Sequence, residues 1–499
     1  MNKYFISLAL LVTLSFSNGY ASKQSLDNPE ELLASLSLRD KIAQLIIAAA
    51  VSNEDANKDF MKQSPYRMDK NQLEFLIKHC HIGGVIFLGS GIRSEQTART
   101  KYYQKISEIP LLIVCDAEYG SAMRLRDGFA FPQNMTLGAL QDDSLIYDMG
   151  YYIGLDLQQL GVHMNLAPVT DVNNNPDNPI IDKRSFGSDP YIVARKSVQF
   201  TKGLQKSGIM ACAKHFPGHG DTTIDSHVAL PTIPHSRTHL NEVELIPFKA
   251  AIENQIDAIM IAHIAVPELE SMPNLPASLS HVIVTELLKE ELGFDGLILT
   301  DGLGMCGATM NQQAGMLELQ ALLAGADMLL CPRDASLVIK FILEAIEKGM
   351  ISEELINQKV LRVLKTKKRA FQQSIGSAIS KEEMQKLKQE IYCQAVTQVF
   401  DKRTKSAAGT TLSIVPSSRY ESDNFGITAE QIKQLEKKHA EEIEITIVIY
   451  GTPYAAELFA PYAHRLIVAY EDTPEARAAV EQVINGTRIA RGKLPVSFE

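Results

Sequence analysis

The sequence predicts an α/β protein, a (β/α)8 TIM-like barrel followed by a small α/β sandwich-type domain. Short apolar runs alternate with longer amphipathic stretches from residue 38 to about residue 368, as expected of repeated βα units around a parallel sheet. Eight such runs occur, which is the number of strands in this barrel. With 499 residues the chain exceeds the size of one ordinary core, so a second domain is expected.

The eight predicted strands are short, and most are uninterrupted runs of apolar residues. Strands of a parallel sheet are buried on both faces, so they show continuous apolar runs and not an alternating pattern. The runs cover residues 42–48 (IAQLIIA), 84–88 (GVIFL), 111–115 (LLIVC), 163–169 (HMNLAPV), 209–213 (IMACA), 258–262 (AIMIA), 297–300 (LILT) and 327–331 (DMLLC).

The domain boundaries follow from changes in composition. Residues 22–370 are assigned to the barrel, which we expect to be the catalytic domain. Residues 371–389 are polar and are predicted to form a linker with some helix. Residues 390–499 are assigned to the second domain, with strands at 411–415, 443–450 and 465–470 and a helix at 475–484.

The first 21 residues are predicted to be a secretory signal peptide. Lys3 precedes an apolar stretch at residues 4–16, and Gly19 and Ala21 are small residues at the −3 and −1 positions of a cleavage point. The apolar stretch is shorter than the ~20 residues that span a bilayer. We therefore expect export, with the mature protein periplasmic or secreted and without stable membrane insertion.

Composition excludes several other classes of protein. The chain has 49 Lys and Arg against 59 Asp and Glu, a net charge of −10, which is unfavourable for binding nucleic acid. Its six cysteines form no CxxC motif and no repeated spacing, so neither a zinc knuckle nor a disulfide scaffold is expected. The cysteines are interpreted as mostly buried small apolar residues.

Polar residues follow five of the eight predicted strands, at the end where a barrel enzyme has its active site. A single charged residue at such a place is often only a helix cap or a loop ion pair. Polar residues after five strands on the same rim favour a functional site. The residues are Asp116 and Glu118 after the third run, Asp171 after the fourth, Lys214 and His215 after the fifth, His263 after the sixth and Asp301 after the seventh.

The densest group lies in residues 214–227 (KHFPGHGDTTIDSH). Proline and glycine exclude a regular helix, so we expect a loop that is flexible enough to fold over a pocket. His215 and His219 have the HxxxH spacing of metal ligands, but without a helix their imidazoles do not share a face, and a metal site is not favoured. Asp225 is placed to orient His227 and to raise its proton affinity, which suits an acid/base group.

A nucleophile is then required. Asp301, at the end of the seventh run (ILTDGLGM), is the candidate, with Gly302 and Gly304 expected to leave room for substrate. A serine nucleophile is not favoured because the chain contains no GxSxG motif.

These motifs resemble a known family. KHFPGHGDTTIDSH, NLAPVTDVNNNPDNPIIDKRSFGSDP, AHIAVP, PASLS and TDGLGM are similar to the glycoside hydrolase family 3 β-N-acetylhexosaminidases of the NagZ type, over about residues 38–368. The resemblance implies that Asp301 is the nucleophile, His227 the acid/base and Asp225 its orienting partner. It also implies a set of residues that bind the hydroxyl and N-acetyl groups of the terminal sugar, namely Asp116, Arg124, Arg184, Lys214 and His215.

Two positions depart from the family pattern. The usual D-x-E-G-G is here DAEYG, with Tyr119 in place of a glycine, and the seventh-strand motif has Gly302 and Gly304 where the family has other residues. The ending NGTRIARGKLPVSF resembles the close of the family's second domain, here shortened.

Three functions remain open at this point. The leading hypothesis is a retaining exo-β-N-acetylglucosaminidase acting on peptidoglycan fragments or chitin oligomers, without cofactor or metal and as a monomer. A β-GlcNAc phosphorylase is the alternative, because a histidine acid/base leaves the site less negative and able to admit phosphate. A non-catalytic cell-wall-binding protein is disfavoured, because a binding module needs none of Asp301, Asp225 and His227.

Overall fold

The computed structural model describes residues 25–66, 68–226, 228–305, 315–373, 376–404, 409–417, 421, 423–441 and 443–497. The predicted signal peptide at residues 1–21, His227 and Cys306 lie outside these residues. The five described cysteines are buried and unpaired, as the sequence suggested. Within the described ranges, no helix is long and apolar enough to cross a membrane.

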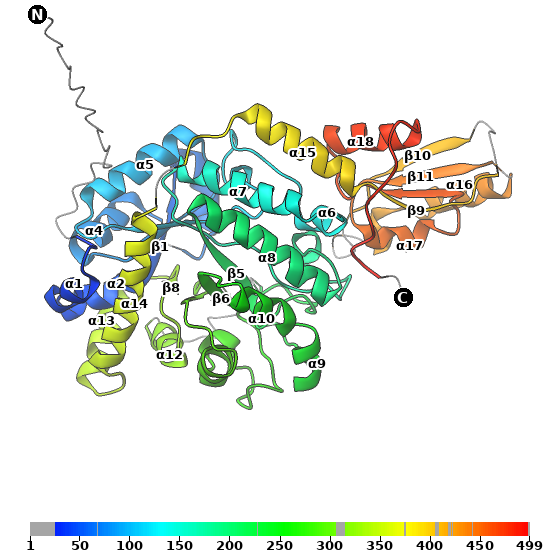
Figure 1. Cartoon of the computed structure of the whole chain (residues 1–499). Coiled ribbons are helices and arrows are strands. Elements are labelled where there is room, and N and C mark those ends of the chain that lie inside the picture. Colours follow the sequence, from blue (N-terminus) through cyan, green and yellow to red (C-terminus); the bar gives the residue numbers. More distant parts are fainter. Residues whose placement is uncertain are drawn as a thin grey trace, which may run out of the picture.

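Eight parallel strands form the barrel, in the spatial order β7-β6-β5-β4-β3-β2-β1-β8. Figure 1 shows the barrel on the left and the carboxyl-terminal part of the chain on the right. A parallel bridge between Leu299 and Met328 joins the two ends of this sheet, which confirms the predicted closed arrangement. The strands are β1 (Ile46–Val51), β2 (Gly84–Leu88), β3 (Leu112–Cys115), β4 (Met164–Asn165), β5 (Met210–Phe216), β6 (Ala258–Ile261), β7 (Leu297–Thr300) and β8 (Leu329–Leu330).

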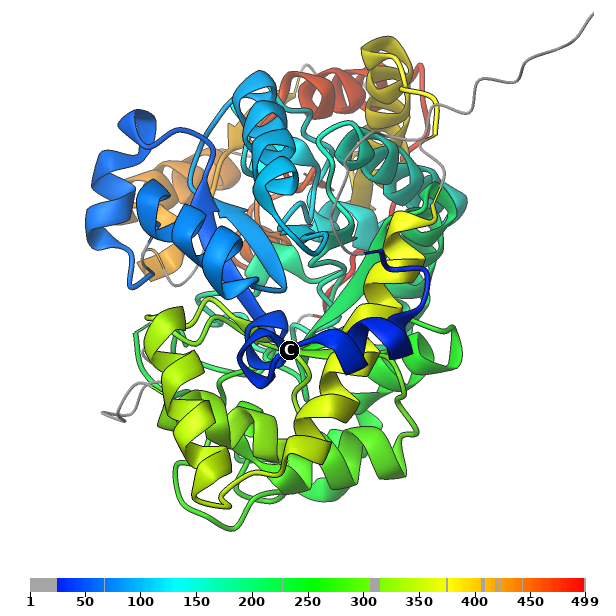
Figure 2. The ribbon, with the colours of Figure 1, turned by 90° about the vertical axis from the view of Figure 1, so that its left-hand side faces the viewer.

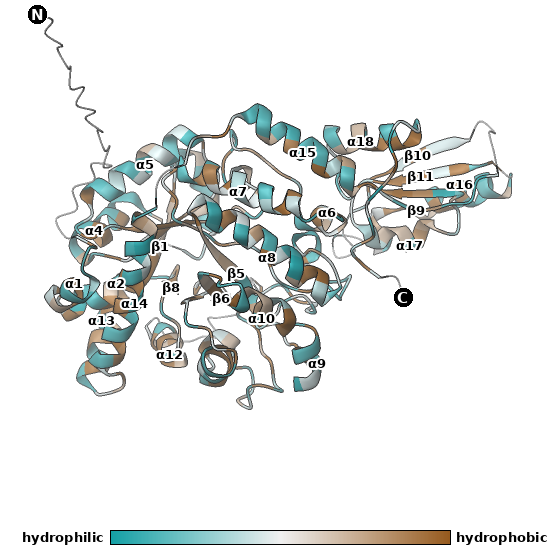
Figure 3. Ribbon diagram, viewed as in Figure 1, coloured by the Kyte–Doolittle hydropathy of each residue, from teal (hydrophilic) through white to brown (hydrophobic). Residues whose placement is uncertain are grey.

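Helices surround the strands, as the turned view shows (Figure 2). The strands are hydrophobic and the outer faces of the helices are largely hydrophilic (Figure 3). This is the pattern expected when amphipathic helices cover a fully buried sheet. The helices are α1 (Pro29–Ser35), α2 (Leu38–Gln44), α3 (Lys58–Gln63), α4 (Lys70–Cys80), α5 (Arg93–Ile106), α6 (Asn134–Gly138), α7 (Ser144–Gln158), α8 (Pro190–Ser207), α9 (Arg237–Glu242), α10 (Leu245–Glu253), α12 (Met316–Ala324), α13 (Ala335–Glu347) and α14 (Glu353–Phe371), with a π-helical segment at Val282–Glu291.

The first strand begins later than the apolar pattern predicts. The run at 42–48 starts inside α2, and β1 begins only at Ile46. Ser37 caps α2 by accepting a hydrogen bond from the Asp40 amide, which favours a helix at this point. Because the end of the helix and the strand are both buried, the apolar pattern does not mark the boundary between them.

The second domain contains a four-stranded sheet in the order β10-β11-β12-β9. Its first strand, β9, was not predicted, and it pairs antiparallel with β12. The predicted linker holds the start of a helix, α15, that leads directly into β9. The elements are α15 (Lys381–Ala395), β9 (Thr397–Asp401), β10 (Thr410–Ile414), α16 (Ala429–Ala440), β11 (Ile445–Ile449), α17 (Ala456–Phe459), β12 (Arg465–Val468) and α18 (Pro474–Ile484).

The second domain holds loops at the carboxyl face of the barrel. The Tyr454 hydroxyl donates to the Asn173 carbonyl at 2.7 Å, in the loop after β4. Glu471 accepts hydrogen bonds from the Gln133 amide at 2.9 Å and the Thr136 hydroxyl at 2.6 Å, in the segment after β3. These contacts are buried or part-buried, so the small domain stabilises the two loops that carry predicted sugar-binding residues.

Candidate active site

The predicted site residues converge at the carboxyl ends of the strands. Asp116 follows β3 directly, Lys214 and His215 lie in the last part of β5, and Asp301 follows β7. Arg124 and Arg184 come from the loops after β3 and β4. The carboxyl ends of parallel strands form one rim, which explains why residues so far apart in the chain meet.

A network of ion pairs joins four of these side chains through Glu118. Lys214 Nζ lies 2.9 Å from Asp116 Oδ1 and 2.9 Å from Glu118 Oε1. Arg124 Nη2 donates to Asp116 Oδ2 at 2.6 Å. Arg184 holds Glu118 with two bonds, from Nη2 at 2.8 Å and from Nε at 3.0 Å. Both oxygens of each carboxylate are therefore bound by cations, and the bidentate Arg184 contact fixes the orientation of Glu118.

Burial and charge compete in this network, and the charges prevail. Burial alone would raise the pKa of Asp116, but Lys214 and Arg124 hold the pKa of that carboxyl far below its usual range. Burial would also raise the pKa of Glu118, but Arg184 and Lys214 hold it far below its usual range. Burial also opposes the charge of Lys214, but Asp116 and Glu118 raise its pKa. All the members are therefore charged at neutral pH, three cations against two carboxylates.

His215 is held by a second buried carboxylate, Asp171. The two side chains meet at 2.7 Å between His215 Nδ1 and Asp171 Oδ2. Asp171 Oδ1 accepts hydrogen bonds from the backbone amides of His215 at 3.2 Å and His219 at 2.7 Å. A carboxylate on Nδ1 fixes the ring orientation and directs Nε2 away from it.

His219 is occupied elsewhere. Its ring nitrogens lie 2.9 Å from Thr222 Oγ1 and 3.1 Å from Ser226 Oγ. Burial, with the nearby His215, lowers its pKa to about 4, so the imidazole is neutral. Both ring nitrogens of His219 and Nδ1 of His215 thus have other hydrogen-bonding partners.

The first half of the loop after β5 is held in place. Asn178 Nδ2 donates to the carbonyls of His219 at 2.9 Å and Gly220 at 2.8 Å. A side chain at Gly220 would meet the Val172 carbonyl at 1.7 Å, so only glycine allows this close approach. The loop was expected to be flexible enough to fold over a pocket, and at Gly220 it makes close contact with the loop after β4.

The predicted acid/base pair is only partly described. Asp225 lies near the end of the loop, and its carbonyl accepts the amides of Val228 at 2.9 Å and Ala229 at 3.1 Å. His227 itself lies outside the described residues. The pairing of Asp225 with His227 therefore stays a prediction.

The carboxylate of Asp301 is oriented by its own turn. Its Oδ1 accepts the Gly302 amide at 2.7 Å, and its backbone amide donates to the Ile261 carbonyl at 2.9 Å, which ties it to β6. His263 Nε2 lies 3.1 Å from the Gly302 carbonyl, and His263 Nδ1 lies 2.7 Å from Ser278 Oγ. The motifs AHIAVP, PASLS and TDGLGM thus support one another around the predicted nucleophile.

Tyr66 fills the space beside Gly302 and Gly304. A Cβ at Gly302 would lie 2.2 Å from Tyr66 Oη, and one at Gly304 would lie 2.5 Å from Tyr66 Cε1. The expectation that these glycines leave room for substrate is therefore wrong, because this side chain takes the space. Burial, together with the charges of Asp301 and Asp116, raises the pKa of Tyr66 well above its usual value.

Sequence reasoning missed the roles of three residues. Glu118 and Asp171 were noted at the rim but not assigned, although Glu118 lies three residues and Asp171 two residues after the end of a predicted strand. No sequence signal marks Tyr66, which reaches the site from the segment before α4. Tyr119, the departure from the family's glycine, is half-buried, and burial raises its pKa, with the charge of Glu471 in the second domain contributing.

Known proteins resemble this chain over the same region. Residues 37–366 match the family described as Glycosyl hydrolase family 3 N terminal domain. Beta-hexosaminidase A of Pseudoalteromonas piscicida is 31% identical over 364 residues, which is 66% of this chain and 61% of that protein, so the chain spans less than two thirds of that relative.

Two solved structures are similar in fold. A glycoside hydrolase family 3 β-N-acetylglucosaminidase from Paenibacillus sp. str. FPU-7 superposes with a TM-score of 0.76 at 29% identity, over 93% of this chain and 99% of that one. The β-glucoside phosphorylase BglX has a TM-score of 0.78 over 96% of this chain and 97% of that one, but at 22% identity this likeness concerns the fold alone. With a family match that covers the whole barrel, the chain belongs to glycosyl hydrolase family 3.

Proposed function

We propose that this protein is a retaining exo-β-N-acetylglucosaminidase that hydrolyses terminal β-GlcNAc from peptidoglycan fragments or chitin oligomers. The observation that carries the proposal is the buried ion network of Asp116, Glu118, Arg124, Arg184 and Lys214, on the same rim as the Asp301 carboxylate. The names of the β-hexosaminidase and β-N-acetylglucosaminidase relatives support the same activity.

The network is suited to holding a polar sugar. Its N–H groups are donors to hydroxyl and acetamido oxygens, and its carboxylates are acceptors for sugar hydroxyls. Because the ion pairs already fix these side chains, little ordering remains to be done when the sugar binds.

In the proposed mechanism Asp301 attacks C1 of the sugar while His227 protonates the leaving oxygen. The bond from C1 to the leaving oxygen breaks and a covalent glycosyl-enzyme forms. His227 then accepts a proton from water, which attacks C1 and releases the sugar with net retention. Asp225 orients the imidazole and stabilises its protonated form.

The phosphorylase alternative is not favoured. The structural likeness to a β-glucoside phosphorylase is at 22% identity, whereas the relative at 31% identity is named a hexosaminidase.

The roles of Asp301 and His227 are separable by leaving group. Asp301→Asn should abolish turnover of every substrate, because the covalent step is lost. His227→Ala should harm a GlcNAc disaccharide far more than an activated aryl β-GlcNAc, since a good leaving group departs with little protonation. Asp225→Ala should act in the same direction but more mildly. Equal losses on both substrates in the His227 variant, or an inverted product, would contradict the mechanism.

The 2-acetamido group should determine specificity. A site built to hydrogen-bond a substrate group leaves buried polar atoms unpaired when that group is absent. We expect kcat/KM for an aryl β-GlcNAc to exceed that for the matched β-glucoside by at least about a hundredfold. Comparable values for the two glycosides would show that the network does not recognise the acetamido group.

Tyr66 and Gly302 should be energetically coupled. Gly302→Ala places a methyl group against the Tyr66 hydroxyl and should displace Asp301, with a loss of kcat/KM of about a hundredfold. In a Tyr66→Phe background the closest clashing atom is absent, so Gly302→Ala should lower kcat/KM by a smaller factor. Equal costs in both backgrounds would mean that Tyr66 does not set the position of Asp301.

We also propose that residues 1–21 direct export and are removed, on the evidence of their sequence pattern. Amino-terminal sequencing of the exported protein should begin close to Ser22. A mature chain that still begins at Met1 would contradict the cleavage.

A further inference from the structure

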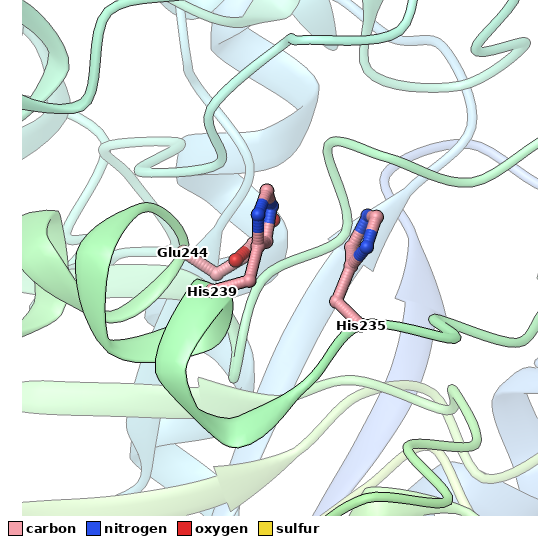
Figure 4. A group of neighbouring side chains, drawn as sticks. All are labelled: His235, His239 and Glu244. Carbon is pink, nitrogen blue, oxygen red and sulfur yellow. The ribbon is translucent and has the colours of Figure 1, made fainter.

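A second group of polar side chains lies against the loop after β5. His235 precedes α9, His239 lies within it, and Glu244 lies at the start of α10. One ligand atom from each of the three residues lies within 4.8 Å of the others. Figure 4 shows the His239 ring beside the Glu244 carboxylate, with the His235 ring facing them. The centres of the two imidazole rings are 4.1 Å apart.

The atoms that face this space lack partners. Both carboxylate oxygens of Glu244 and Nε2 of His239 are buried and have no hydrogen-bond partner among the residues that the structure describes. Only 2% of the Glu244 side chain is exposed, and His239 Nε2 lies 3.4 Å from Glu244 Oε1 without forming a hydrogen bond. Burying a carboxylate without hydrogen-bond donors costs free energy, and a bound ligand would remove this cost.

A fourth residue completes the set. Asp221 Oδ2 lies 2.5 Å from His235 Nε2. Metal-binding histidines commonly present one ring nitrogen to a carboxylate and the other to the metal. Two neutral imidazoles and two carboxylates also balance the charge of a divalent ion, which a buried site requires.

We infer that His235, His239 and Glu244, with Asp221 on His235, form a binding site for a divalent transition-metal ion of the Zn²⁺ class. Two histidines and a glutamate are a ligand set that Zn²⁺ uses in proteins, with a fourth position left for water. This site is separate from the sugar-binding network and from Asp301.

The position of the site gives the ion a structural role. A Cβ at Gly218 would lie 2.8 Å from Cβ of Glu244, so the glutamate packs directly against the loop after β5. Asp221 belongs to the same loop, three residues after Gly218. An ion at this site therefore ties the loop that leads to Asp225 to the start of α10. The inference does not rest on the proposed glycosidase activity.

The test is direct metal binding to the purified full chain, stripped with a chelator and then dialysed against micromolar Zn²⁺ at neutral pH. We expect about one bound Zn²⁺ per chain by elemental analysis, and a rise in melting temperature on adding the metal. Co²⁺ in place of Zn²⁺ should give the visible absorption of a site with nitrogen and oxygen ligands.

Variants locate the ion. His239→Gln and Glu244→Gln should each weaken Zn²⁺ binding by at least about tenfold and remove the thermal shift. His239 is partly exposed, so its variant is expected to fold even if the buried Glu244 variant does not. The matched control is His281→Gln, because His281 and Glu286 form an exposed pair elsewhere, 3.5 Å apart. This change should leave binding unchanged.

Two results would overturn the inference. One is wild-type protein that retains no more Zn²⁺ than background. The other is full Zn²⁺ binding in the His239 variant, which would place the metal elsewhere. Because metal content is measured without substrate, a failure of the proposed glycosidase activity would leave this result interpretable.

Discussion

The ion pairs of Lys214 are the interaction on which the rest of the site depends. Its ammonium group lies 2.9 Å from both Asp116 and Glu118, and it is 3% exposed. Without it two buried carboxylates would lie close together with only their arginine partners. Removal of one member of a buried ionic network typically costs about 3–5 kcal/mol. Lys214 therefore joins β5 to the residues after β3 and fixes the pocket before any sugar binds.

Residues around the ion network also hold the pocket in place. Asp171 holds both His215 and the start of the loop after β5, and Asn178 holds that loop at His219 and Gly220. The second domain reaches the same loops through Tyr454. Because the loops after β3, β4 and β5 contact another loop or the second domain, the position of the predicted sugar-binding residues depends on the assembled molecule and not on one segment. A metal ion beneath Gly218 would add one more such constraint.

The sequence predicts the barrel well where an apolar run has clear ends. The runs at 84–88 and 297–300 coincide with β2 and β7, whereas β1 begins within an apolar run that a helix shares. β9 was not predicted because it is a half-exposed edge strand whose buried and exposed residues do not alternate. Rim residues such as Asp116 are predictable because each follows a strand. Tyr66 is not, because its place beside Gly302 arises from packing between distant segments.

The most direct test of this account is to trap the proposed covalent intermediate. An activated fluorosugar of GlcNAc that slows breakdown of the glycosyl-enzyme should inactivate the protein with one sugar per chain. Proteolysis and mass spectrometry should then find the sugar on the peptide that contains Asp301. Attachment to another residue, or turnover of GlcNAc substrates without any trapped adduct, would contradict the assignment of Asp301 as the nucleophile of this site.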